Sequence, residues 1–338
     1  MQKVAVVVPN WNGMDSIKDC LDSLLGQTLE HSLIVVENGS SDGSLAYLRE
    51  NYPEVKIIVN QTNLGFAAGV NSGIKFAIEN GAKFVALFNN DAVADKRWLE
   101  YLYKELEVND DVGIATCKLV SADNSHLDST GDFYTNWGLP FPRGRGETDL
   151  NKYDKQTEIF GASGGASLYR VSVLKEIGLF DEDFFAYYED VDISFRAQLA
   201  GWRVRFVPSA VAYHQIGATS GKIRGFTTYH SMKNLPLLLF KNVPRKYFWT
   251  IAWRFKTAYI MFYLRSITRG NGWSATKGLF RGYYLVIKKI GERKKIQSSK
   301  KVTDEYIWGM IVHDLPPNAK ALRKIRLKWW KLTGKSAK

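Results

Sequence analysis

Hydrophobic runs and polar turns alternate along the first 115 residues. Four short runs rich in β-branched residues predict strands, and three segments with apolar residues at helical spacing predict the helices between them. The predicted strands are Val4–Val8, Leu33–Glu37, Val55–Asn60 and Phe84–Phe88, and the predicted helices are Ser16–Leu25, Ser44–Asn51 and Phe66–Glu79. This alternation predicts an α/β fold, with a mostly parallel sheet covered by helices.

The pattern becomes irregular between about 118 and 158, and least regular at 136–146. A connection of this length is typical of a lid, a binding loop or disorder. Periodicity returns with predicted helices at Val171–Ile177 and Val191–Ala200, followed by predicted strands at Arg203–Pro208 and near Val211–His214.

Charge divides the chain in two. Residues 1–220 contain 19 lysines and arginines against 30 acids, a net charge of −11, whereas residues 221–338 contain 27 against four, a net charge of +23. We therefore expect a catalytic α/β domain at 1–220 and a basic, aromatic, mainly helical region at 221–338. Such a region favours an anionic partner. A non-catalytic nucleic-acid- or membrane-binding protein is an alternative, but no recognised nucleic-acid module is present and the acidic body opposes it.

The basic region has the composition of a membrane-surface helix. In Ala321–Leu332, Leu322, Ile325, Trp329 and Leu332 share one helical face, and Phe240–Leu264 and Phe280–Lys289 add aromatic and basic residues. No apolar run reaches the length of a spanning helix. Neither cysteine lies in a metal or redox spacing, and no export signal precedes the first strand. We expect a cytoplasmic protein, peripheral on the inner face of the membrane; packing of the basic face on the catalytic domain, or a homodimer through it, are alternatives.

Asp91 follows the predicted strand Phe84–Phe88 through Asn89 and Asn90. The carboxyl ends of strands in an open sheet border the ligand crevice, and Mg²⁺ commonly uses one or two protein carboxylates together with phosphate oxygens. Asp91 is therefore a candidate metal ligand, with a simple strand-end cap as the alternative. His214 ends the last predicted strand and is a candidate second ligand or a structural histidine.

A second group of acids, Glu189, Asp190 and Asp192, lies in an aromatic segment. Buried carboxylates are costly unless they are paired, metal-bound or catalytic. The spacing of Asp192 and Arg196 predicts an ion pair. Asp190 is then the better candidate for a general base, with Glu189 beside it. N-capping and solvation are the alternative roles of these acids.

Two turns have polar groups suited to a nucleotide. Glu37 or Asp42, in the turn after Leu33–Glu37, is placed to bind a ribose or a base, unless the turn only caps the next helix. The segment Asn63–Gly73 contains three glycines besides Asn63 and Asn71, which suits either a ligand or close packing of a helix on the sheet.

Gly161–Gly165 formally matches the G-x-S-x-G nucleophile pattern, and Ser163, Asp190 and His214 follow the chain order of an α/β hydrolase. That motif needs a strong strand before it and a helix after it, and only Glu158–Phe160 precedes it here. The hydrolase is kept as an alternative.

Six motifs, taken in order, resemble the family 2 glycosyltransferases of the GT-A fold, particularly bacterial enzymes similar to rhamnosyltransferases. They are Val7–Asn12, Val35–Ser44, Asn63–Gly73, Leu87–Asp91, Gly161–Arg170 and Gly178–Gly201, and the resemblance covers about residues 3–215. It implies a GT-A mixed sheet and inverting transfer of a sugar from a nucleotide-diphosphate donor to a hydroxyl of a lipid-linked or polysaccharide acceptor in bacterial cell-surface glycan synthesis. The donor that it favours is dTDP-rhamnose.

The resemblance also implies roles for individual residues. Asp190 is the base beside Glu189, Asp91 binds Mg²⁺ or Mn²⁺ and the diphosphate, and His214 is a second metal ligand. The residues expected beside the nucleotide are Pro9, Asn12, Glu37, Asp42, Asn63, Asn71, Asn89, Asn90 and Asp91. Glu37 stands where Asp is commoner, and Asn89-Asn90-Asp91 lacks the first acid of the D-x-D pattern, which predicts weak metal binding without the donor. The acceptor pocket is expected at Gly161–Gly165 and residues 133–146.

Overall fold

The protein is described here by a computed structural model covering residues 2–215, 223–320 and 322–324. The strands are β1 (Val4–Asn10), β2 (Ser32–Asn38), β3 (Lys56–Asn60), β4 (Phe84–Phe88), β5 (Ala92–Ala94), β6 (Val112–Ser121), β7 (Leu127–Ser129), β8 (Asp132–Tyr134), β9 (Pro140–Pro142), β10 (Glu158–Ile159), β11 (Ala166–Arg170) and β12 (Arg203–His214). The helices are α1 (Ile17–Leu25), α2 (Ser44–Asn51), α3 (Gly65–Glu79), α4 (Trp98–Val108), α5 (Val171–Ile177), α6 (Glu189–Leu199), α7 (Phe226–Asn242), α8 (Arg245–Thr268), α9 (Gly272–Lys288), α10 (Ile290–Ser298) and α11 (Asp304–Met310), with a 3-10 turn η1 at Glu182–Phe184.

Within the described residues, ten strands form one mixed sheet. Its order is β10-β12-β6-β11-β4-β1-β2-β3, with β5 added to β12 and β7 added to β6, while β8 and β9 pair separately. The strands β3, β2, β1 and β4 are parallel, and β11 is antiparallel to β4 and to β6. This confirms the predicted mixed α/β sheet. It also brings the carboxyl ends of β1, β2 and β4 to one edge, where ligands of such sheets bind.

All seven elements predicted in the first 115 residues are present, with ends within two residues of the prediction. The two strands predicted after Gly201 form one strand, β12, whose pairing with β6 shifts between Val207 and Val211. The sequence pattern did not reveal β6 or β11. The irregular stretch 118–158 includes the end of β6, all of β7, β8 and β9, and the first residue of β10.

The sheet is buried on both faces because side chains of β1 alternate. Val4, Val6 and Val8 pack with α1 and α4, whereas Ala5 and Val7 pack with α3, α5 and α6. Helix α3 approaches so closely that a Cβ on Gly73 would lie 2.4 Å from Val7 Cγ1. Gly73 therefore serves close helix–sheet packing, one of the two interpretations that the sequence left open for this segment.

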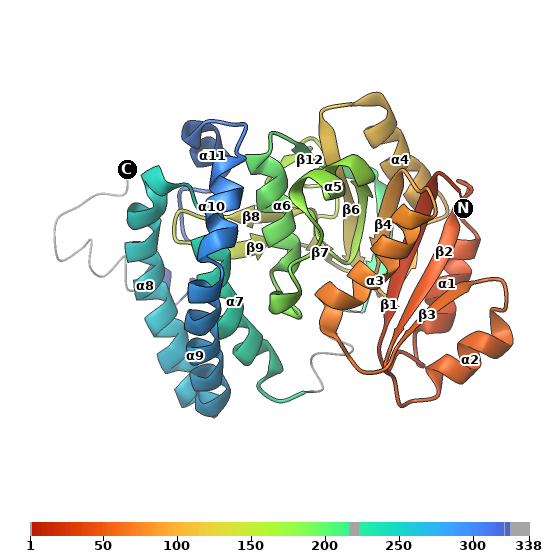
Figure 1. Cartoon of the computed structure of the whole chain (residues 1–338), viewed down its shortest axis with the longest axis horizontal. Coiled ribbons are helices and arrows are strands. Elements are labelled where there is room, and N and C mark those ends of the chain that lie inside the picture. The colour runs from red at the N-terminus through yellow and green to blue at the C-terminus, as the bar shows by residue number, and fades with distance from the viewer. Residues whose placement is uncertain (1, 216–222, 321, 325–338) are drawn as a thin grey trace.

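A third core joins the two parts of the chain. Helices α7, α8, α9 and α11 contribute apolar residues that pack with Tyr134, Phe160, Phe184 and Phe195 of the α/β part. Figure 1 shows α7 to α10 standing beside α6, at the end of the molecule opposite β1 to β3. The predicted boundary between residues 220 and 221 is therefore crossed by a continuous apolar core. The predicted amphipathic segment Ala321–Leu332 lies, but for residues 322–324, outside the described residues.

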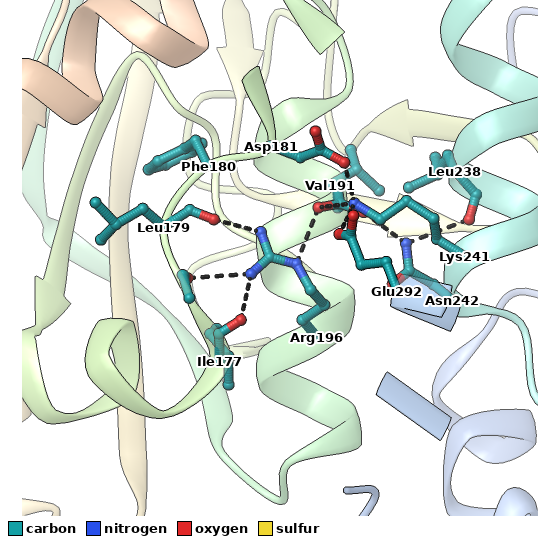
Figure 2. A network of polar contacts seen from close by, with 12 residues as sticks. Ile177, Leu179, Phe180, Asp181, Val191, Arg196, Leu238, Lys241, Asn242 and Glu292 are labelled. Carbon is teal, nitrogen blue, oxygen red and sulfur yellow. Dashed lines mark hydrogen bonds and ion pairs between the residues drawn. The ribbon is translucent and has the colours of Figure 1, made fainter. Parts of the chain in front are cut away.

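A buried ion-pair network crosses the same boundary (Figure 2). Lys241 of α7, fully buried, lies 2.5 Å from Asp181 and 3.1 Å from Asp192. Arg196 pairs with Asp192 at 2.9 Å, as the i, i+4 spacing predicts, and donates to the carbonyls of residues 177–179. Breaking a buried ion pair leaves an uncompensated charge, so the network holds α7 firmly on α6.

Candidate active site

The predicted nucleotide end of the site is a chain of buried polar groups. Asn90 Nδ2 donates to Asn10 Oδ1 at 2.8 Å, and Asn10 Nδ2 donates to Glu37 Oε2 at 2.6 Å. Glu37 Oε1 accepts from the amide of Ser40 at 2.9 Å. Both carboxylate oxygens of Glu37 therefore have partners inside the protein, and the strand ends of β4, β1 and β2 are tied together. Asn10 was not among the predicted site residues.

Asp42, Asn12 and Pro9 lie beside this network. Asp42 accepts from the amides of Met14 and Ser44 at 2.9 and 3.0 Å, and both Asp42 and Asn12 are exposed. Asn12 links the ends of β1 and β2, because its side chain accepts from the amide of Ser41 at 2.8 Å. Pro9, half-buried, is the penultimate residue of β1. These three residues remain at the edge where a ligand would enter.

Two other predicted residues have structural contacts instead. Asn71 is buried, donates to the carbonyl of Phe180 at 2.8 Å and accepts from the amide of Phe180 at 3.1 Å. Asn63 accepts from the amide of Gly65 at 2.8 Å and from Asn38 at 3.2 Å. The side-chain amide of Asn71 thus fixes the 178–184 segment to α3, and the structure does not place it at the site.

Asp91, His214 and Asp128 meet at one point of the sheet. His214 pairs with Ala92 across β12 and β5, which brings its Nε2 to 3.1 Å from Asp91 Oδ1. On the other side, His214 Nδ1 lies 2.8 Å from Asp128 Oδ2. Asp128 is the extra residue of an irregularity between β6 and β7, where Leu119 faces Ser129 and Val120 faces Leu127. Such bulges redirect a side chain, here toward His214.

The electrostatics favour a cation at this point. Burial alone would lower the pKa of His214, but the neighbouring carboxylates of Asp128 and Asp91 outweigh burial and raise the pKa to about 9. Asp91 Oδ1 is buried and has no hydrogen-bond partner among the described residues, since the 3.1 Å contact lacks hydrogen-bond geometry. Two ligands of one octahedral Mg²⁺ are separated by about 3 Å. Asp91 and His214 therefore fit a divalent ion that takes the place of the proton on His214 Nε2. The described part of the chain offers no group of three or more acids, histidines or cysteines arranged for a metal.

Three further acids, Asp132, Glu189 and Asp190, interact inside the protein. Burial, and then repulsion from Asp190, raises the pKa of both Asp132 and Glu189 well above the ordinary values. Burial also raises the pKa of Asp190, but amides of Gly164 and Val191 donate to its carboxylate at 3.0 and 2.8 Å and favour the anion. Like charges in one site cannot all ionise easily. Of the three, Asp190 is the acid best prepared to be a base.

Gly164 and Gly165 bring the two groups of acids together. Asp190 accepts from the amide of Gly164, and the carbonyl of the next residue, Gly165, accepts from the amide of Asn89 at 2.8 Å. Added Cβ atoms would lie 3.3 Å from Asp190 Cβ at Gly164 and 3.1 Å from Asn89 Nδ2 at Gly165. Arg145, half-exposed, pairs with Asp128 at 2.8 Å and acts electrostatically on Asp132 and Asp190. Asp91 and His214 thus lie at one end of the candidate site and Asp132, Glu189 and Asp190 at the other, and Arg145 interacts with acids at both ends.

The hydrolase alternative lacks its structural context. Ser163 is preceded by the two-residue strand β10 and followed by a strand, β11, where a nucleophile elbow needs a helix. Asp190 binds the amide of Gly164, and His214 binds Asp128 and Asp91. The three residues are therefore committed to other partners, and we reject the triad.

Comparison with known families identifies the family of this chain. Residues 5–178 match the sequence model of glycosyl transferase family 2. The chain belongs to this family. The match ends before Glu189, Asp190 and His214, so these three residues and α7 lie outside the matched region.

Relatives of this family 2 glycosyltransferase include sugar-transferring enzymes of known name. It is 27% identical over 210 residues to an N-acetylglucosaminyl-diphospho-decaprenol L-rhamnosyltransferase of Mycobacterium tuberculosis, covering 56% of this chain and 68% of that protein. It is 25% identical over 231 residues to the dTDP-rhamnosyl transferase RfbF of Shigella flexneri, covering 66% of this chain and 76% of that protein. The predicted resemblance to rhamnosyltransferases is confirmed.

Solved structures confirm the GT-A fold. The mannosyltransferase PcManGT of Pyrobaculum calidifontis, solved with GDP-Man and Mn²⁺, superposes with a TM-score of 0.54 at 17% identity, covering 91% of this glycosyltransferase and 85% of that chain. Residues 1–349 of Staphylococcus aureus TarS superpose with a TM-score of 0.53 at 16% identity, covering 88% and 91%. At these identities the likeness concerns the fold alone.

Sequence reasoning missed Asn10, Asp128, Asp132 and Arg145. Asp128, Asp132 and Arg145 lie in the stretch 118–158, where short strands left no readable period. One signal was available: acids and arginines concentrated in a long connection of an α/β domain indicate a binding loop.

Proposed function

We propose that this glycosyltransferase is an inverting enzyme that uses Asp190 as general base. A hydroxyl of the acceptor loses its proton to Asp190 as its oxygen attacks the anomeric carbon of the donor, from the face opposite the nucleotide. The proposal rests on two backbone amides, those of Gly164 and Val191, which donate to Asp190 and favour its anion. Among the described residues, the neighbouring acids Asp132 and Glu189 have no such pair of donors, and their pKa values are raised well above the ordinary values.

The nucleotide-diphosphate donor is proposed to lie at the ends of β1, β2 and β4. Pro9, Asn12 and Asp42 would face the nucleoside, while Asn89, Asn90 and Asp91 would lie toward the diphosphate, with Arg145 as an additional cation near it. Asp91 and His214 would hold Mg²⁺ or Mn²⁺, which supplies positive charge to the leaving diphosphate when bound. Glu37 supports this end from within, through Asn10 and Ser40.

We propose dTDP-rhamnose as the donor and a lipid-linked or polysaccharide glycan of the bacterial cell surface as the acceptor. Both named relatives above are rhamnosyltransferases, and one is named for a diphospho-decaprenol substrate. Acceptor-binding residues are expected at Gly161–Gly165 and in the 133–146 connection, which supplies Arg145.

A lipid-linked acceptor would give the basic region a purpose, and we propose that α8 and α9 attach the enzyme to an anionic cytoplasmic membrane face. No helix in the described ranges is long and apolar enough to cross a membrane. On α8, Trp249 and Trp253 are 79% and 71% exposed, and on α9 Trp273 is 72% exposed. Lys256 lies 5.8 Å from the Trp253 ring, and Lys277 lies 5.0 Å from the Trp273 ring. Residues 223–291 contain no Asp or Glu. Exposed tryptophans with lysines and no acids suit a lipid headgroup layer.

A donor panel tests the proposed reaction. Purified enzyme would be offered dTDP-rhamnose, UDP- and GDP-sugars with Mg²⁺ or Mn²⁺ and a short diphospholipid-linked acceptor, with product detected by mass spectrometry. The stereochemistry of the new linkage would be read by NMR. Transfer from dTDP-rhamnose with an inverted anomeric centre supports the proposal, whereas a retained anomeric configuration contradicts the role of Asp190.

A further inference from the structure

The loop that leads into the acids Glu189 and Asp190 has an unusual backbone. Phe185, Tyr187 and Tyr188 have positive φ angles of 64°, 69° and 71°. Phe185 is the centre of a tight turn, with ψ of −62° and a hydrogen bond of 2.7 Å from the amide of Ala186 to the carbonyl of Phe184. Residues with side chains adopt such angles rarely, and they persist only where the surroundings impose them.

Helix α7 supplies those surroundings. The side-chain amide nitrogen of Asn234 faces three carbonyls of the loop, those of Phe184, Ala186 and Tyr187, at 3.0, 2.8 and 2.8 Å. Lys233, its neighbour in α7, donates to the carbonyls of Asp183 and Phe184 at 2.7 and 3.0 Å. Asn234 is fully buried. It therefore binds a backbone that would otherwise have unpaired carbonyls inside the protein.

The remaining carbonyls of the loop are also held. The carbonyl of Phe185 accepts from the amide of Ala67, in the first turn of α3, at 3.2 Å, and that of Tyr188 accepts from Asp192 in α6 at 2.9 Å. Every carbonyl from residue 183 to residue 188 thus accepts a hydrogen bond. The loop lies between α3 of the α/β domain and α7 of the basic region. It ends directly at the two acids, Glu189 and Asp190.

We infer that Asn234 is a positioning residue for the glycosyl transfer proposed above. It fixes the loop at Phe184, Ala186 and Tyr187, and so sets where α6 begins and where the carboxylates of Glu189 and Asp190 stand. The basic region is then part of the catalytic apparatus, besides any contact it makes with a membrane. This inference rests on the proposed role of Asp190.

Asn242 offers a matched control. It is a fully buried asparagine on α7, two turns after Asn234, and donates to Asp192 Oδ1 at 2.8 Å and to the carbonyl of Leu238 at 3.2 Å. Asn242→Ala removes a buried amide from the same helix without touching the loop. Both alanine variants are expected to lose stability, and only Asn234→Ala should alter the loop.

The first test compares these variants by steady-state kinetics and donor binding. We expect Asn234→Ala to lower kcat by about 10²-fold while the donor affinity changes less than about threefold, because the change lies on the acceptor side. Tyr187→Gly, added to Asn234→Ala, should restore part of kcat, since glycine adopts a positive φ without cost. Equal kcat for Asn234→Ala and Asn242→Ala would overturn the inference. Should Asn234→Ala fail to fold, Asn234→Ser, which retains one donor, is measured by the same comparison.

The second test needs no substrate. Amide hydrogen exchange of residues 183–190 is expected to rise in Asn234→Ala and to stay near the wild-type rate in Asn242→Ala. If exchange responds in this way but no nucleotide sugar is turned over by the wild-type protein, the proposed function fails and the structural role of Asn234 stands. Unchanged exchange in Asn234→Ala contradicts the positioning role.

Discussion

Asp128 Oδ2 lies 2.8 Å from Nδ1 of His214, on the side of the ring opposite Asp91. A metal-binding histidine usually donates its other ring N–H to a carboxylate, which fixes the tautomer and the ring orientation. Asp128 is buried and is itself paired with Arg145. Asp128 would therefore orient Nε2 of His214 toward the divalent ion proposed next to Asp91.

Asp128→Asn is expected to weaken binding of Mn²⁺ by about 10- to 100-fold, because such supporting carboxylates typically contribute that much to metal affinity. Titration calorimetry of Mn²⁺ in the presence of a nucleoside diphosphate measures the change. Asp123→Asn is the control, since Asp123 is an exposed acid of the same connection that binds Ser121 and Ser125. Equal Mn²⁺ affinity in both variants would contradict the metal role of His214.

Asp190→Asn is expected to lower kcat by about 10²- to 10⁴-fold, the usual contribution of a general base, with donor affinity unchanged. In the wild type, kcat should rise with pH as Asp190 loses its proton. Because the pKa of Asp190 is raised by burial, this rise should lie at higher pH than for an ordinary aspartate. Glu182→Gln, in the same segment but exposed, is the control. A variant that turns over at the wild-type rate excludes Asp190 as the base.

Lys241→Met is expected to lower the free energy of unfolding by about 3 kcal/mol, the lower end for a broken buried ion pair, because Asp181 and Asp192 lose their shared cation but keep Lys289 and Arg196. Lys246→Met breaks an exposed pair with Glu305, which water and salt screen, and should cost far less stability. Urea unfolding followed by circular dichroism compares them. A similar loss in both variants would show that the network of Figure 2 contributes little.

The stability of the protein should fall in acid through Asp181. Burial alone would raise its pKa, but the charges of Lys241 and Lys289 outweigh burial and lower the pKa to about 2. A carboxyl with a lowered pKa stabilises the fold above its unfolded pKa, and that contribution is lost as the pH falls from about 4 to about 2. In Lys241→Met the pKa of Asp181 rises, so the loss should begin at higher pH. Thermal unfolding at a series of pH values measures both profiles, and identical profiles would contradict the assignment.

Replacement of Trp249 and Trp253 by serine is expected to weaken binding to vesicles that contain phosphatidylglycerol by at least about tenfold, since each exposed ring would otherwise be buried in the headgroup region. Flotation with phosphatidylglycerol and with phosphatidylcholine vesicles measures the effect and its dependence on lipid charge. Val108→Ser, an exposed apolar residue at the end of α4, is the control. Unchanged flotation of the tryptophan variant would contradict the proposed contact of α8 with the membrane surface.

The elements that were predicted correctly from the sequence are those with apolar interiors and with polar residues only at their ends. Strand β4 is entirely apolar and its prediction was correct at both ends. Strand β6 was missed because Thr116 and Lys118 interrupt its pattern, and both are buried with partners far along the chain. Lys118 pairs with Asp154 at 2.8 Å, and Ser167 of β11 donates to Thr116 at 2.7 Å. A buried polar residue that is satisfied at long range cannot be distinguished locally from a loop residue.

The same limit applies to the site. Asp91 and Asp190 were predicted because each stands where an element begins or ends, and the structure brings their surroundings together across Gly164 and Gly165. Asn71 was assigned to the nucleotide because it lies in a glycine-rich segment, but its contact with Phe180 depends on a segment more than a hundred residues later. Asn234 lies in a basic helix with no local sign of its partners.

The contact between α7 and the loop before Glu189 limits how such enzymes can be recombined. A chimera that joins residues 1–220 of this chain to the C-terminal helices of a relative would separate Asn234 from its three carbonyls and Lys241 from its two aspartates. Exchange of the C-terminal helices between homologues should therefore give an active enzyme only when residues 178–192 are exchanged together with α7. Residues 178–192 and α7 are separated in the sequence, but they form one packed unit in the structure and must be replaced as one.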